Sequence, residues 1–351
     1  MDPVTSNATL SADAARIPSG HALRRLVPIG LVVGGVGIGG ALVLAPSEPQ
    51  RFFFSYLTAF VFLWTLTMGA LFFVLLQFVT RAGWSVVVRR FAENTMALLP
   101  LLAVLFVPLI FGVHTLYHWS HAEAVARDAL LTHKQPYLNE TFFLVRAGIF
   151  FVIWLAAAHL FYRASVAQDQ SGDHALTHHM QRYAPIFLIL FALTLTYAAF
   201  DWLMSLTPHW YSTIYGVYIF AGSVMGIMAW LVIVAATLQR AGLLRRELHV
   251  EHYHDLGKLL FAFTAFWAYI AFSQFMLMWY ANLPEETIWY AERNRAAWRV
   301  VSLVLLMGHF VLPFFFLMSR HIKRRLPLLV GAAVWMLVAH YIDIYWLVMP
   351  A

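Results

Sequence analysis

The segment FFFSYLTAFVFLWTLTMGALFFVLLQFV, residues 52–79, runs for 28 residues without one charged side chain. A helix needs about 20 consecutive apolar residues to cross the hydrocarbon core of a bilayer, so this segment is predicted to span a membrane. The whole chain has the same character, because 62% of its 351 residues are hydrophobic and 11% are charged. Soluble domains contain about 25% charged residues. The sequence therefore predicts an all-α, polytopic membrane protein.

Further apolar segments of spanning length lie on both sides of this one. Nine are expected in all, at approximately 26–45, 52–79, 93–113, 141–162, 184–204, 213–238, 258–281, 298–319 and 326–348. The first is Gly-rich and shows no clear cleavage site, so we expect a retained, peripheral transmembrane helix and not a signal peptide. The polar residues 1–25 are expected to form a mobile N-terminus.

The distribution of Lys and Arg predicts the orientation in the membrane. With the N-terminus inside, sixteen of the 23 basic residues fall in inside loops and six in outside loops, while Arg146 lies within a span. Inside loops of membrane proteins carry this excess. We therefore expect a cytoplasmic N-terminus. Because the basic residues sit in short loops, they do not suggest nucleic acid as a partner.

A faint internal repeat divides the chain. MGAL at 68–71 resembles MGIM at 225–228, and an aspartate stands near the end of both the fifth and the ninth span. One interpretation is two four-helix bundles of the same orientation, residues 52–206 and 212–349. Chance similarity is the alternative.

The fifth predicted span carries a polar stripe. Thr194, Tyr197, Asp201 and Ser205 follow one another at intervals of three, four and four residues, which places them on one helical face. Hydroxyl groups leading to a carboxylate can relay protons. The same face could instead pack against neighbouring helices with its polar groups hydrogen-bonded. The sequence leaves both interpretations open.

Other ionisable groups are expected at the depth of Asp201, toward the outer surface. Asp343, with His340 one turn away, Arg146 and Gln274 could all meet Asp201 between the bundles. Intramembrane ionisable groups are candidates for function. The competing interpretation is an Arg–Asp pair that only locks helices together.

A second polar set is expected toward the cytoplasm, either at the interface with water or as the inner half of a proton path. Only His309 lies deeper. The set comprises Glu93, His159, Lys258, His309 and Gln77, bordered by His254 and Asp255.

The residue types also limit the cofactors. The chain contains no cysteine, which excludes disulfides, thiolate-bound iron–sulfur clusters and covalent haem attachment from it. No helix carries a spaced pair of histidines, so bound haem and bound metal are not expected. Gly30 and Gly34, like Gly222 and Gly226, have the small-xxx-small spacing that predicts close helix packing.

Two predicted outside loops are long enough to dock a partner. Residues 114–140 include an expected amphipathic helix near 120–132, and residues 282–297 mix Trp and Tyr with charges. An aromatic belt at the membrane surface would explain the same composition.

Four stretches carry a resemblance to a known family. They are FFFSYLTAFVFLWTLTMGALFFVLLQ (52–77), KQPYLNETFFLVRAGIFFVIW (134–154), DWLMSLTPHWYSTIYGVYIFAGS (201–223) and YIDIYWLVMP (341–350). They are similar to the ActF subunits of bacterial alternative complex III, which belong to the NrfD-like, polysulfide-reductase-type membrane subunits. The resemblance implies two four-helix bundles and ten spans. This chain stops after the ninth, where a loop to a tenth would begin.

The resemblance also implies a function. Such a chain would be a non-redox subunit of a quinol:cytochrome c (or quinol:acceptor) oxidoreductase. A sister NrfD-like subunit would bind quinol, and haem c and iron–sulfur clusters would reside in multihaem and monohaem cytochrome c subunits and an iron–sulfur subunit. Whether a terminal oxidase joins them stays open. The chain itself would be a scaffold, and Asp201, Asp343, Arg146 and His340 would be candidates for a proton half-channel.

Two alternatives remain. The chain could form its own quinol site near the outer surface from His114, Asp201 and Tyr197, because such a pocket needs an apolar slot and an acid–base pair. It could instead be a stand-alone secondary transporter. Transporter sites lie at the membrane midplane, however, whereas the charged groups here are expected in the outer third.

Overall fold

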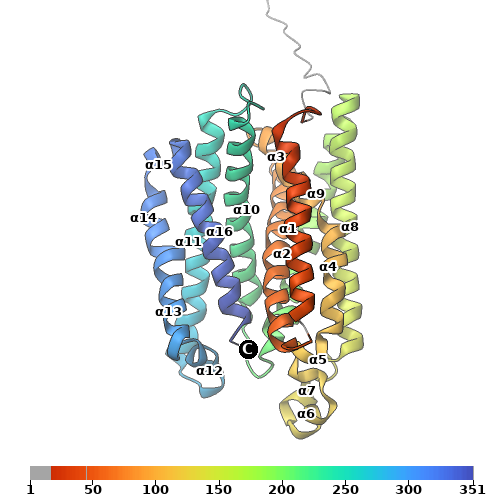
Figure 1. The fold of residues 1–351 in the computed structure, drawn as a ribbon, viewed down its shortest axis with the longest axis vertical. Helices are drawn as coiled ribbons and strands as arrows, with labels where there is room; N and C mark the ends of the chain where they lie inside the picture. The colour runs from red at the N-terminus through yellow and green to blue at the C-terminus, as the bar shows by residue number, and fades with distance from the viewer. Residues whose placement is uncertain (1–16, 45, 351) are drawn as a thin grey trace, which may run out of the picture.

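The computed structural model describes residues 17–44 and 46–350, so most of the predicted mobile segment 1–25 lies outside the described residues. Within these ranges every regular element is a helix, and nine helices are long and apolar enough to cross a membrane (Figure 1). The predictions of an all-α chain and of nine spans are confirmed for this part of the chain.

The nine spans are built from eleven long helical segments and one π-helical turn. They are α1 (Leu26–Leu44), α2 (Pro49–Val79), α3 (Val86–Met96) with α4 (Leu99–Phe111), α8 (Glu140–Ser171), α9 (Ala175–Trp202), α10 (Tyr215–Arg240), α11 (Val250–Ala281), α13 (Ala296–Leu305) with η4 (Leu306–Val311) and α14 (Leu312–Met318), and α16 (Leu326–Val348). The shorter elements are η1 (Ala22–Arg25), α5 (Val113–Leu116), η2 (His118–Ser120), α6 (Ala122–Arg127), α7 (Ala129–Lys134), η3 (Met204–Leu206), α12 (Pro284–Arg293) and α15 (Arg320–Arg324).

The helices pack in two groups that share a central seam. In the first group α2 packs against α3, α4 and α9, and α8 packs against α9 and α4. In the second, α10 packs against α11 and α16, and α11 packs against α14. The groups meet where α10 and α16 contact α2, and α1 lies outside them, in front of α2 in the view of Figure 1.

Glycine allows the closest approach in the seam. A Cβ atom on Gly69 of α2 would lie 2.2 Å from the backbone oxygen of Ser223 on α10, which no side chain can tolerate. The predicted packing role of Gly222 and Gly226 is confirmed, because both lie against the ring of His340. Gly30 and Gly34 of α1 meet nothing within 4 Å, so the packing predicted for them does not occur within the described chain.

The two ends of the molecule differ. The elements α6, α7 and α12 lie at one end together with the C-terminal end of α16, and α15 lies at the opposite end (Figure 1). We refer to these as the α12 end and the α15 end. Three helices extend several residues beyond the predicted spans toward the α15 end, namely α8, α9 and α11. Their added turns are polar, so a hydropathy pattern does not include them.

Two spans are interrupted. The third breaks at Ala97 and Leu98, between α3 and α4, because Pro100 has no N–H to donate to the Met96 carbonyl and its ring crowds that carbonyl. The eighth contains the π-helical turn η4 immediately before Pro313, and the indole Nε1 of Trp335 donates to the Gly308 carbonyl there at 2.6 Å. Such turns occur often at functional sites.

The helix expected near 120–132 is two short helices. Asp128 separates α6 from α7, because its carboxylate accepts the backbone N–H groups of Leu130 and Leu131 at 2.9 and 3.2 Å and so caps the start of α7. The prediction of one continuous amphipathic helix was therefore wrong at this residue.

Candidate functional site

The first buried ionic site joins α8 to α9. Arg146 Nε donates to Asp201 Oδ2 at 2.7 Å, and Arg146 Nη2 donates to Oδ1 at 3.1 Å. Asp201 is 0% exposed, and Arg146 is buried as well. This two-point contact is the strongest geometry for a guanidinium and a carboxylate.

Tyr137 completes the surroundings of this pair. Its hydroxyl donates to Asp201 Oδ1 at 2.9 Å, and its backbone carbonyl accepts from Arg146 Nη1 at 2.9 Å. The guanidinium also lies 3.9 Å from the centroid of the Tyr137 ring and 4.3 Å from that of Phe142. Both carboxylate oxygens are thus occupied by donors, and the charge of Asp201 is matched. The ion pair therefore has the features of a structural contact that holds α8 against α9.

The remaining residues of the stripe do not continue a hydrogen-bonded chain to Asp201. Thr194 accepts from Trp154 Nε1 at 2.8 Å and donates to the Leu190 carbonyl at 2.7 Å. Ser205 lies beyond the end of α9 and donates to the backbone carbonyl of Asp201, at 2.5 Å, and not to its carboxylate.

Tyr197 faces outward and is 46% exposed. No hydrogen bond or ion pair within the described residues joins it to Asp201. His114 is exposed too, and pairs with Glu140 at 3.1 Å. The two residues that the alternative quinol site would need beside Asp201 are therefore not brought to it.

The second buried carboxylate, Asp343 on α16, has different neighbours. The Tyr218 hydroxyl donates to its Oδ1, and the Trp267 indole Nε1 donates to its Oδ2 at 3.2 Å. Asp343 is buried, and within the described residues it forms no ion pair. Only neutral donors from α10 and α11 hold this carboxyl group.

His340 lies one turn before Asp343 on α16. Its Nε2 is 2.9 Å from the hydroxyl oxygen of Thr65 on α2, and the same hydroxyl oxygen lies 2.9 Å from the Phe62 carbonyl. The direction of the hydrogen bond with Thr65 follows from the tautomer of His340, whose other ring nitrogen is Nδ1. This Nδ1 is buried and has no partner among the described residues.

His309 is the third group of this site. It lies in the π-helical turn η4, is fully buried, and its ring centroid is 3.9 Å from that of Trp267. Neither of its ring nitrogens has a partner among the described residues. Its ring lies 6.5 Å from that of His340. We call Asp343, Tyr218, Trp267, His309, His340 and Thr65 the α16 cluster.

The predicted meeting of all the outer groups between the bundles does not occur. Arg146 and Asp201 lie in the first helix group, and no contact among the described residues links them to Asp343 or His340. Gln274 joins neither pair, because it accepts from Ser212 Oγ at 2.9 Å and donates to the Tyr290 hydroxyl at 3.1 Å. The expected single site is thus two separate ones.

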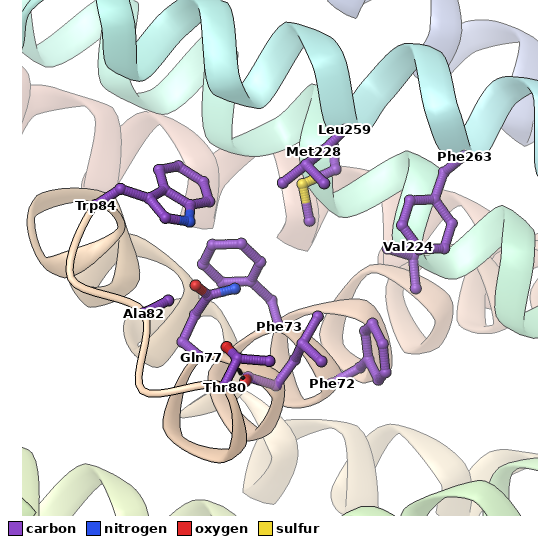
Figure 2. A pocket seen from close by; sticks show the side chains of 11 residues that line it. Phe72, Phe73, Gln77, Thr80, Ala82, Trp84, Val224, Met228, Leu259 and Phe263 are labelled. Carbon is purple, nitrogen blue, oxygen red and sulfur yellow. Dashed lines mark hydrogen bonds between the residues drawn. The ribbon is translucent and has the colours of Figure 1, made fainter.

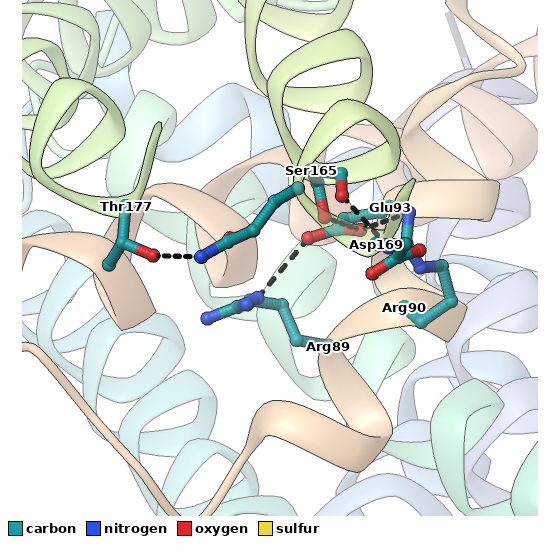
Figure 3. Close-up of polar contacts among 7 residues, drawn as sticks. Arg89, Arg90, Glu93, Ser165, Asp169 and Thr177 are labelled. Atoms are coloured by element: carbon teal, nitrogen blue, oxygen red, sulfur yellow. Dashed lines mark hydrogen bonds and ion pairs between the residues drawn. The ribbon is translucent and has the colours of Figure 1, made fainter. Parts of the chain in front are cut away.

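The predicted inner set is also divided. Glu93 is buried and lies 3.2 Å from Arg89 and 3.0 Å from Arg90, while the Ser165 hydroxyl donates to it at 2.8 Å. Arg90 reaches on to Asp169 of α8, so this group fastens α3 to α8 (Figure 3).

The other members of the inner set lie elsewhere. His159 is exposed, with its Nε2 3.3 Å from Arg163, and Lys258 is exposed, 2.6 Å from Asp255. His309 belongs to the α16 cluster. These positions do not form one connected path.

Gln77 points into a small cavity between the helix groups. The cavity measures about 170 Å³, and the amide oxygen of Gln77 is buried without a partner among the described residues (Figure 2). Apart from Gln77 and Thr80 the lining is largely apolar, and it includes neither His309 nor His340. The cavity is therefore not an evident continuation of the α16 cluster.

Sequence reasoning missed four residues of these sites, among them Thr65, which contacts His340. Tyr137 reaches Asp201 from the segment before α8, and Tyr218 and Trp267 reach Asp343. Tyr218 was already part of the quoted motif 201–223, but aromatic donors are too common in membrane helices to stand out from spacing alone.

No group of three or more potential metal ligands occurs among the described residues. No protein-family model matches the chain, and no curated protein matches it either.

Proposed function

We propose that this chain is an integral membrane subunit of a quinol:cytochrome c (or quinol:acceptor) oxidoreductase of the bacterial cytoplasmic membrane. It scaffolds the complex and provides part of a proton path, while quinol is oxidised in a sister subunit. The sequence resemblance supports the assignment to the complex. The α16 cluster is the observation that supports a role in proton movement.

The α16 cluster has the chemistry that proton transfer needs. Each member of a relay must be able to accept a proton and to release it. Asp343 is held by neutral donors alone, and His340 and His309 present ring nitrogens without partners. Ionisable groups at membrane depth are costly, so a site that contains three of them without a balancing ion pair is a functional candidate.

The Arg146–Asp201 pair supports the proposed scaffold role. The carboxylate of Asp201 is paired with a cation, whereas that of Asp343 is held by neutral donors only. The buried charges of the pair are balanced, and it joins two helices. We therefore assign Asp201 to the scaffold and Asp343 to the proton path.

The exterior supports membership of a larger assembly. The helix α1 is exposed from Leu26 to Gly40, and the short helices α6, α7 and α12 project at the α12 end (Figure 1). We propose that this end faces outward, with the N-terminus cytoplasmic, and receives the cytochrome c and iron–sulfur subunits. The family's architecture of two four-helix bundles and a peripheral helix is part of the same proposal.

Purification through a tag on this chain in a mild detergent tests the assignment. We expect c-type haem bands in the reduced-minus-oxidised spectrum, and an iron–sulfur protein and a second NrfD-like protein by mass spectrometry. A colourless chain that elutes alone would overturn the proposal and favour a stand-alone transporter.

A further inference from the structure

A second, larger cavity of about 1160 Å³ opens between α11 and the segment from α12 to α14. Along α11 its lining extends from Ala265 to Asn282, which corresponds to about 25 Å at 1.5 Å per residue. The facing wall runs from Arg299 of α13 to Phe314 of α14. The cavity thus follows the helices from the α12 end into the depth of the membrane.

Polar and apolar groups are separated along this cavity. Asn282, Tyr290, Arg293 and Arg299 lie at the α12 end. Farther along, the lining residues are apolar or aromatic, as shown by Phe272, Leu306, Phe310 and Phe314. The cavity is therefore amphipathic, with its polar part where the membrane surface would be.

Arg293 is the central polar residue. It is 1% exposed, and its guanidinium lies 3.6 Å from the centroid of the Trp289 ring. It donates to three backbone carbonyls, those of Trp289, Trp346 and Leu347, at 3.1, 3.2 and 3.0 Å. A guanidinium has five N–H donors, so two remain without a partner among the described residues.

No acid lines this end of the cavity, although the neighbouring Glu292 interacts with the charge of Arg293 from outside the lining. Burial lowers the pKa of Arg293 to about 10, which leaves it protonated at neutral pH. Within the described residues neither Arg293 nor Arg299 forms an ion pair, and the lining of the cavity includes no Asp or Glu. Burial raises the pKa of Tyr290 to about 12, so its hydroxyl stays a neutral donor.

We propose that this cavity binds an anionic glycerophospholipid, with the phosphate at Arg293 and Arg299 and an acyl chain along Phe272, Phe310 and Phe314. The charge favours this class of ligand, because Arg293 is buried and a headgroup without net charge would leave its charge unmatched there, while the exposed Arg299 adds a second cation at the rim. The phosphate would accept charge-assisted hydrogen bonds from the N–H groups of Arg293 that no backbone carbonyl occupies. This inference does not depend on the proposed function.

The length of the apolar wall supports a lipid over a free phosphate ion. One leaflet of a bilayer has a hydrocarbon depth of about 15 Å, which is half of the core. The cavity extends at least this far beyond its polar end. Because Arg293 also binds the last carbonyls of α16, a phosphate there would stabilise the packing of α12 against α16.

The test uses the full chain purified in detergent. Native mass spectrometry is expected to show one retained anionic phospholipid per chain, and added phosphatidylglycerol should raise the melting temperature more than phosphatidylcholine with the same acyl chains. The variant Arg299→Gln should weaken binding of phosphatidylglycerol about tenfold, which corresponds to about 1.4 kcal/mol. Arg293→Lys should weaken it as well, but it also disturbs the three carbonyl contacts.

Arg295→Gln is the matched control, because Arg295 is exposed on the same segment and does not line the cavity. It should bind lipid as the wild type does. Equal stabilisation by the two lipids would overturn the proposal, and so would unchanged binding in Arg299→Gln. Retention of a quinone in place of a phospholipid, or a melting temperature raised equally by inorganic phosphate, would also contradict it.

Discussion

Arg146 and Asp201 form a two-point ion pair across α8 and α9, with nitrogen–oxygen distances of 2.7 and 3.1 Å. The hydroxyl of Tyr137 occupies the same carboxylate. The other buried aspartate at this end, Asp343, has neutral donors only. This contrast between two aspartates in similar sequence positions is the basis for giving them different roles.

Removing one member of the Arg146–Asp201 pair should destabilise the protein strongly. Arg146→Gln leaves a buried carboxylate without its cation, which costs about 3–5 kcal/mol in buried pairs. The double variant Arg146→Met/Asp201→Leu should recover most of this loss, because no unpaired charge remains. Thermal unfolding in detergent measures both. A single variant as stable as the wild type would show that the pair does not stabilise the contact between α8 and α9.

Replacing His309 should separate stability from function. Buried polar atoms without partners cost about 1–3 kcal/mol, and phenylalanine keeps the ring against Trp267 without those atoms. We expect His309→Phe to unfold at an equal or higher temperature than the wild type, while proton movement by the assembled complex decreases. A large loss of stability would instead indicate that His309 is held by partners that a phenylalanine cannot replace.

The seam between the helix groups should not tolerate a side chain at Gly69. Gly69→Ala would place a Cβ atom 2.2 Å from the Ser223 carbonyl oxygen, so α2 and α10 must move apart, at a cost of about 1–3 kcal/mol. Gly148→Ala is the control, since nothing lies within 4 Å of that position on α8. It should stabilise its helix by about 0.5–1 kcal/mol. Opposite shifts in melting temperature are expected, and equal shifts would contradict the packing described here.

Acid should destabilise the start of α7, because it protonates the capping carboxylate of Asp128. The hydrogen bonds from His209, Leu131 and Leu130 lower the pKa of the Asp128 carboxyl group. The stabilisation that this carboxylate gives the folded protein is therefore fully present above its unfolded pKa of about 4. This contribution is lost as the pH falls through the lower pKa of the folded state. Protease cleavage between residues 120 and 134 should therefore increase below about pH 4. The Asp128→Asn variant should lack this step, and an unchanged acid step in it would assign the effect to another group.

Hydropathy and charge predicted the number of spans because each apolar run exceeds the length that a bilayer requires. They did not predict the polar ends of α8, α9 and α11, which lie outside the apolar runs. The break at Asp128 depends on a capping hydrogen bond that competes with helix continuation. The sequence alone does not tell whether such a residue caps a new helix or continues the previous one.

The candidate site was predicted in its residues but not in its connections. Asp201, Arg146, Asp343, His340 and His309 are all buried, as intramembrane ionisable residues are expected to be. Which of them meet depends on the rotation and packing of the helices, which spacing along one helix does not determine.

Tyr197 shows the limit of spacing arguments on a single helix. At about 100° per residue it lies about 60° from Thr194, at the edge of the stripe, and it faces outward. Ser205 follows the end of α9, so helical spacing no longer applies to it.

The most direct test of the account is the proton-to-electron ratio of the purified complex in liposomes, compared between the wild type and Asp343→Asn. Asparagine keeps one oxygen that can accept from the Trp267 indole, and its amide N–H can donate to the Tyr218 hydroxyl oxygen. We therefore expect normal assembly, continued quinol oxidation and fewer protons moved per electron. Asp173→Asn is the control, because Asp173 is exposed between α8 and α9, and it should leave the ratio unchanged. An unchanged ratio in a fully assembled Asp343→Asn complex would contradict the proposal that the α16 cluster conducts protons.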